Sequence, residues 1–392
     1  QSENHEKESQ NEENELIKSL EEQLADLKNK MKLLNKEEEE NNGIIFNEKN
    51  EAIIPDSFTS IPGDCLQNKR EIIRCVIIPK SVVMIESNAF NGCKSLEILN
   101  VPLSVKFIGD SSFSNCISLQ DFLIPDSVDS LGLYAFSNCE KLEKIKLSSS
   151  LIIIKKGTFD RCYSLKFLKI PNSVKSLGEK AFSECKKLRN IVLSKSLTKI
   201  KDDAFANCEK LRFIEIPNSV NKIGSSIFYG CKQLKEVILS SKIDSFKESM
   251  FLDCKSLKSI KVEEKKTNVK SPRKVTFENN DNDDPEDNES PEEEELNEDQ
   301  SENDNNPEDG SLDTLIVPPT IKTIEDNAFE GCKFKAIHFP SSVEMIGNNV
   351  CKGSKKLTFI KIDSPKATIK CDAFNGLISL EKIESNSSLT SV

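Results

Sequence analysis

The residues of this chain best suited to chemistry are its 13 cysteines, because a thiolate is a nucleophile, a metal ligand and the precursor of a disulfide. Eight of them recur every 23 residues: Cys93, Cys116, Cys139, Cys162, Cys185, Cys208, Cys231 and Cys254. No C-x-x-C pair occurs, so the spacing typical of zinc sites is absent. Disulfides between neighbouring repeats would need Cβ atoms about 3.8 Å apart. We expect free thiols instead, since a cysteine at one fixed position of a repeat behaves as a small buried hydrophobic residue.

Apart from the cysteines, the sequence has few residues that could form a catalytic or metal-binding site. Only two histidines occur, His5 and His338, and neither belongs to a Ser-His-Asp or Cys-His-Asn set that a repeat would bring together. The acidic stretch 304–313 superficially resembles a calcium-binding loop, but Pro307 stands at a ligand position and no glutamate closes the loop. We therefore predict no catalytic, cofactor or metal site, and a function that is not enzymatic.

The positions around the cysteines define a 23-residue repeat. A phenylalanine precedes each of the eight cysteines by three residues, and a leucine follows each by three. After the leucine, apolar and polar residues alternate, as in Leu211-x-x-Ile214-x-Ile216, which is the pattern of a strand with one buried face. Pro217 then ends the strand and Gly224 permits a bend. One unit cannot bury its apolar side alone, so we predict stacked units whose parallel strands lie about 4.7–4.9 Å apart.

This pattern resembles the BspA-like (Treponema-type) class of leucine-rich repeats. The match is L-x-x-I-x-I followed by P-x-S-V-x-x-I-G-x-x-A-F-x-x-C, with Ser127, Ser173, Ser196 and Ser219 where leucine-rich repeats usually carry Asn or Cys. The resemblance implies a leucine-rich repeat solenoid, an α/β repeat of short parallel strands with turns or short helices. It also implies a surface or adhesion-type interaction protein, secreted or at the cell surface, although the sequence leaves a cytoplasmic location open.

The composition divides the chain into five parts. Residues 1–15 are polar and predicted to be disordered, and residues 16–42 are predicted to form a helix, part of a coiled coil. Residues 43–262 are predicted to form the solenoid, beginning with a degenerate unit that caps it. Residues 263–311 form an acidic insert, predicted to be disordered, and residues 312–392 continue the solenoid.

The predicted N-terminal helix carries an apolar stripe whose members are spaced alternately by three and four residues. Its members are Ile17, Leu20, Leu24, Leu27, Met31 and Leu34. This is the seam of three heptads and predicts a short coiled coil that joins copies of the chain into a homo-oligomer. Three heptads lie near the lower limit for such a prediction, so the alternative is a single amphipathic helix that is frayed or laid on the first repeat.

The net charge of −11 conceals a positive charge on the repeats. Residues 1–42 carry 13 acidic and 6 basic residues, and residues 278–310 carry 17 acidic residues and no basic ones, so the remainder is net +13. Many of these basic residues occupy positions one, two and four after the repeat leucine, which the strand pattern places on the outward, concave face. No apolar run is long enough to span a membrane.

We predict that this outward face binds a protein ligand through exposed phenylalanines surrounded by basic residues, which are common anchors of protein interfaces. The predicted contact residues are Lys144, Lys146, Lys166, Phe167, Lys169, Arg189, Arg212, Phe213, Lys235, Lys258 and Lys261. Without a ligand role, the same residues would merely keep a strand face soluble. A nucleic acid or other polyanion is the second candidate ligand. It is less favoured because no nucleic-acid-binding motif is present.

Overall fold

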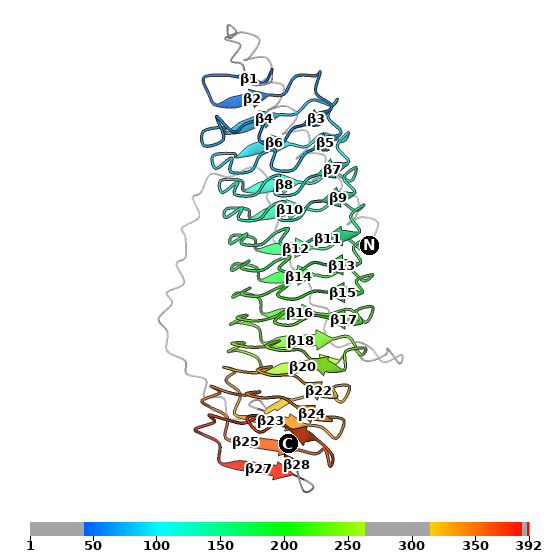
Figure 1. Cartoon of the computed structure of the whole chain (residues 1–392), viewed down its shortest axis with the longest axis vertical. Coiled ribbons are helices and arrows are strands. Elements are labelled where there is room, and N and C mark those ends of the chain that lie inside the picture. The colour runs from blue at the N-terminus through cyan, green and yellow to red at the C-terminus, as the bar shows by residue number, and fades with distance from the viewer. Residues whose placement is uncertain (1–42, 263–313, 386–389, 392) are drawn as a thin grey trace, which may run out of the picture. The chain divides into compact units, whose positions relative to one another are not determined.

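The computed structural model describes residues 43–262, 314–385 and 390–391 (Figure 1). In these residues the chain winds as a solenoid, and most coils contribute two short strands, one to each of two stacks. The predicted disordered segment 1–15, the predicted helix 16–42 with its six apolar stripe residues, and the predicted insert 263–311 lie outside the described residues.

The first strand of each coil is the one that the alternating apolar pattern predicts. The first strands are β2 (Glu51–Ile53), β4 (Cys75–Ile77), β6 (Ile98–Asn100), β8 (Asp121–Leu123), β10 (Lys144–Lys146), β12 (Phe167–Lys169), β14 (Asn190–Val192), β16 (Phe213–Glu215), β18 (Glu236–Leu239), β20 (Ser259–Val262), β21 (Thr314–Ile316), β23 (Ala336–Phe339), β25 (Phe359–Ile362) and β27 (Lys382–Ser385). An additional strand, β1 (Ile45–Phe46), pairs antiparallel with β2 at the N-terminal edge.

The second strands were not predicted, because two residues are too few to show an alternating pattern. They are β3 (Ser60–Ile61), β5 (Met84–Ile85), β7 (Phe107–Ile108), β9 (Ser130–Leu131), β11 (Ile153–Ile154), β13 (Ser176–Leu177), β15 (Lys199–Ile200), β17 (Lys222–Ile223), β19 (Ser245–Phe246), β22 (Thr323–Ile324), β24 (Met345–Ile346), β26 (Thr368–Ile369) and β28 (Thr390–Ser391). The second strands pair in parallel within three sheets, β3 to β9, β11 to β17 and β19 to β28, and the second residue of most is buried in the core.

The interior is filled by the repeat phenylalanines, cysteines and leucines. The rings from Phe90 to Phe251 stack one on the next, with centroids 5.1–6.0 Å apart. Seven repeat cysteines, Cys116 to Cys254, each donate the thiol to the carbonyl oxygen of a phenylalanine 26 residues earlier, at 3.1–3.3 Å. All 13 cysteines are free thiols, and all but Cys371 are buried.

The segment around each repeat phenylalanine forms turns rather than a short helix. Tyr134 and Asn138 flank Phe136 and have φ of 55° and 60°, a left-handed conformation that a continuing α-helix does not contain. Their amides bond to the next coil: the N–H groups of Tyr134, Phe136 and Asn138 donate to Lys156, Thr158 and Asp160 at 2.7–2.9 Å. Within residues 43–262 and 314–385 there is no helix. The repeat pattern was compatible with either turns or short helices in this segment, and the structure has turns.

The repeat that follows Cys254 is interrupted by the acidic insert, and the strands resume at Thr314. β19 pairs directly with β22, and the rings of Phe251 and Phe329 stack with centroids 5.6 Å apart. Cys332 continues the thiol bonds by donating to the carbonyl oxygen of Phe251 at 3.4 Å. The second-strand pairing and the buried core therefore continue across the insertion point. In the first-strand stack β20 ends one sheet and β21 begins another, as also happens between β6 and β8, β10 and β12, and β14 and β16.

Candidate partner-binding surface

The outward side of the first strands carries every predicted contact residue. Along β12 the alternation is plain, because Leu168 points into the core and is 1% exposed whereas Phe167 on its other side is 47% exposed. All eleven predicted residues are exposed, either within β10, β12, β16 and β20 or directly before a first strand. We call these eleven residues the basic face.

Strand register brings the two phenylalanines of the basic face into one row. Phe167 lies opposite Asn190 in the parallel pair of β12 and β14, and Phe213 lies on β16, the next first strand. Two strand spacings, about 10 Å, therefore separate the two rings along the stack. Val192, which was not among the predicted contacts, lies opposite Lys169 and is itself exposed, so it adds apolar surface on β14, the strand between those that carry the two rings.

Two lysines of the basic face form ion pairs with glutamates on the same outward side. Lys166 pairs with Glu143 at 2.7 Å and thereby lowers the pKa of that carboxyl, and Lys261 pairs with Glu236 at 2.5 Å. Within residues 43–262 and 314–385, no acidic partner lies within ion-pair distance of Arg189 or Arg212. These guanidinium groups, next to Phe167 and Phe213, thus keep their charge available to a ligand.

The same outward rows continue beyond the insert, in a part of the chain for which no contact residues were predicted. Lys335 is exposed, and His338 and Lys361 face each other across β23 and β25. His338 Nε2 lies 2.5 Å from Asp363 Oδ2. One repeat after the insert is a residue shorter, so the 23-residue spacing does not mark its outward residues. The alternation of the apolar residues Ile337 and Phe339 could have located them instead.

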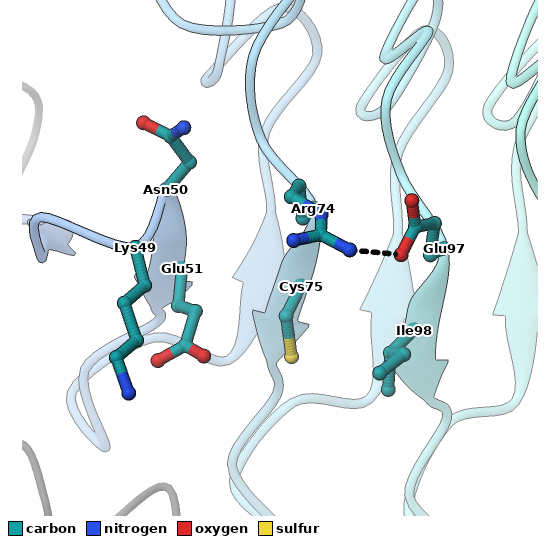
Figure 2. Close-up of a pocket in the computed structure, with 7 residues that line it drawn as sticks. All are labelled: Lys49, Asn50, Glu51, Arg74, Cys75, Glu97 and Ile98. Atoms are coloured by element: carbon teal, nitrogen blue, oxygen red, sulfur yellow. Dashed lines mark hydrogen bonds and ion pairs between the residues drawn. The ribbon is translucent and has the colours of Figure 1, made fainter.

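A shallow pocket lies at the N-terminal end of the first-strand stack (Figure 2). It is lined by Lys49, Asn50, Glu51, Arg74, Cys75, Glu97 and Ile98. Arg74 binds Glu97 at 2.7 Å, and this contact raises the pKa of the guanidinium. The part of the chain that the structure describes holds no cluster of three or more His, Cys, Asp or Glu side chains that could bind a metal.

The repeats match the family model for the BspA type leucine rich repeat region, in six copies, over residues 59–189, 152–282 and 307–392. These ranges cover well over half of the chain. The chain belongs to the BspA-type leucine-rich repeat family. The fold predicted from the repeat pattern is therefore confirmed, both by the family model and by the parallel solenoid.

Two solved structures are similar to this BspA-type chain. A leucine-rich repeat protein from Bacteroides ovatus is 22% identical, with 91% of this chain and 97% of that chain covered and a TM-score of 0.53. The pneumococcal vaccine antigen PcpA is 18% identical, with 89% and 86% covered and a TM-score of 0.54. At these identities the similarity shows the fold alone.

The search of curated proteins found no match to this chain. Among the described residues, no helix has the length and apolar character needed to cross a bilayer.

Proposed function

We propose that this chain is a non-enzymatic scaffold that binds a protein partner through the basic face. One observation supports the proposal most: Phe167 and Phe213 stand exposed in a single row, beside arginines that have no ion pair among the described residues. Aromatic and arginine side chains are the most frequent energetic anchors of protein interfaces, especially where they cluster.

The chemistry of the basic face favours an acidic partner with apolar side chains at its centre. The two rings and Val192 offer apolar contact, and the surrounding lysines and arginines would pair with carboxylates at the rim. Rim charges mainly accelerate association, whereas the buried anchors determine how slowly the complex dissociates. A location at the cell surface or outside the cell belongs to this proposal, and is supported by the similarity to a protein described as a vaccine antigen.

The proposal is tested by capturing extracellular proteins on the immobilised full-length chain and measuring the affinity of the captured partner for variants. F167A/F213A should weaken binding at least about thirtyfold, because the loss of even one anchor costs about 2 kcal/mol. R189E/R212E should weaken it chiefly through slower association. The matched control is K175E/K199E, which makes the same charge change at exposed lysines of the second-strand stack. Equal loss in the control and in R189E/R212E would mean that the partner responds only to total charge.

Heparin and duplex DNA are the probes for the alternative, a polyanion ligand. If the basic face binds phosphate or sulfate groups, affinity should fall steeply and linearly on a logarithmic salt scale. F167A/F213A would then have little effect on duplex DNA, whose bases are already stacked. A protein partner predicts the reverse, with strong dependence on the two rings and a shallower response to salt.

A further inference from the structure

The outward side of β4 is buried, unlike that of the basic face. Cys75, Val76 and Ile77 follow one another along this strand, and strand geometry puts Val76 on one side and its two neighbours on the other. Val76 belongs to the core cluster, so Cys75 and Ile77 point outward. They are nevertheless only 4% and 1% exposed. Something other than the core must therefore cover them.

The neighbouring coils show that this burial is specific to the N-terminal end. Cys75 lies opposite Ile98 of β6, which is 38% exposed, and Figure 2 shows the two side chains projecting from adjacent strands. At the corresponding positions of β10, Lys144 and Lys146 are both exposed. A single-layered sheet leaves its outward side in solvent, so full burial at Ile77 requires a second layer.

The position where the described chain begins indicates what that layer is. Gly43 lies beside Pro55, since a Cβ built on the glycine would be 4.0 Å from Pro55 Cγ. Pro55 follows the end of β2, and the next residue back, Ile54, donates its amide to the carbonyl of Ile77 at 3.0 Å. Gly43, where the described chain begins, therefore lies near Ile77. The segment that precedes Gly43 in the sequence carries the apolar stripe that ends at Met31 and Leu34.

We propose that the apolar stripe of residues 17–34 packs, within the same molecule, on an apolar patch formed by the outward side chains of Ile53, Cys75, Ile77 and Ile98. The connection from Leu34 to Gly43 can span up to about 30 Å when extended, and the patch is only about three strands wide, roughly 15 Å. The apolar stripe is then buried within one molecule, and no second copy of the chain is needed to cover it. The N-terminal end of the first-strand stack is then occupied, and the basic face is left free.

Cys75 provides a reporter for this contact. Alkylation requires the thiolate, and burial, reinforced by the nearby Glu51, raises the pKa of Cys75 to about 12. In the unmodified full-length protein, Cys75 should react with a maleimide as slowly as the core residue Cys185, whereas the exposed Cys371 should react at once. The modified peptides are identified by mass spectrometry after digestion.

The variant M31K/L34K should increase the labelling rate of Cys75 at least tenfold, while Cys185 stays protected and so reports that the solenoid is folded. The matched control A25K/N29K adds the same two charges away from the stripe and should leave Cys75 protected. As a second measurement, L34C should be joined to Cys75 by a short bis-maleimide in monomeric protein.

Two results would overturn the proposal. One is a labelling rate for Cys75 in M31K/L34K that stays within twofold of the unmodified protein, together with no crosslink from L34C. The other is a dimer in sedimentation whose dissociation on dilution exposes Cys75. That outcome would assign the cover to the segment of a second copy, as in the predicted coiled coil.

Discussion

At the scale of single residues, the repeat cysteines combine packing with a weak hydrogen bond. Cys185 donates its thiol to the carbonyl oxygen of Phe159 at 3.3 Å and has no exposed surface. Burial raises the pKa of this thiol well above its ordinary value, and the neighbouring thiols of Cys208 and Cys162 add to the effect. The repeat cysteines are therefore protonated and chemically inert at neutral pH, which fits a structural role.

Replacing this thiol with a hydroxyl should have a moderate cost. In Cys185→Ser the hydroxyl can still donate to Phe159, so we expect a loss of about 1–2 kcal/mol from the desolvation of the hydroxyl and its poorer packing. Urea unfolding measures this loss. Cys371→Ser is the exposed control and should stay within about 0.5 kcal/mol of the unmodified protein. A loss above 3 kcal/mol would show that the hydroxyl cannot reach the carbonyl.

The contact between His338 and Asp363 predicts a pH dependence. The hydrogen bond from His338 lowers the pKa of the Asp363 carboxyl, with Lys361 contributing. Because the folded-state pKa lies below that of an unfolded aspartate, the carboxylate stabilises the fold at neutral pH, and this contribution is lost as the pH falls through the folded-state pKa. We expect His338→Ala to move the carboxyl titration, followed by carbon NMR, to higher pH. An unchanged titration would assign the low pKa to Lys361 alone.

At the scale of elements, the second-strand stack depends on close approach between coils. A Cβ built on Gly178 would lie 2.5 Å from the backbone carbon of Lys155 in the preceding coil. Such a distance is far below van der Waals contact, so a side chain there would force the two coils apart. The next coil carries Lys201 at this position and tolerates a side chain.

Gly178→Ala should therefore destabilise the solenoid by about 1–3 kcal/mol, as expected for overpacking against backbone that cannot move freely. Lys201→Ala is the matched control at the equivalent position of the next coil, and should change stability by less than about 0.5 kcal/mol. Chemical denaturation of both variants is the measurement. Equal effects would indicate that coil spacing adjusts without cost.

At the scale of the whole molecule, the solenoid core is continuous across the insertion point. The pairing of β19 with β22 and the stacking of Phe251 on Phe329 join residues that are far apart in sequence. Lys247 and Glu325 add an ion pair at 2.8 Å across the same junction. None of these contacts involves the acidic insert.

Deleting residues 279–310 should leave the fold intact and slightly more stable. Shortening the connection lowers the entropy cost of closing it by about 1 kcal/mol, because that cost grows with the logarithm of loop length. The midpoint of urea unfolding should rise slightly or stay unchanged. A fall of several kcal/mol would show that the insert contributes packing of its own.

The sequence by itself determined the repeat, its period and its inward side. Phe, Cys and Leu at fixed places in eight successive units are all buried when the coils stack, and alternation along each first strand determined which side faced the core. The same alternation placed the residues of the basic face outward, although that they bind a partner stays a prediction.

Only the tertiary structure decided features that depend on contacts between coils. The two-residue second strands gain their hydrogen bonds from neighbours 23 residues away, so no local pattern marks them. The free charge of Arg189 and the paired charge of Lys166 have the same local sequence signal and differ only in which side chain lies on the adjacent strand. The burial of Cys75 and Ile77 is likewise visible only in the structure, since a short-range sequence pattern specifies which way a side chain points but not how much of it is covered.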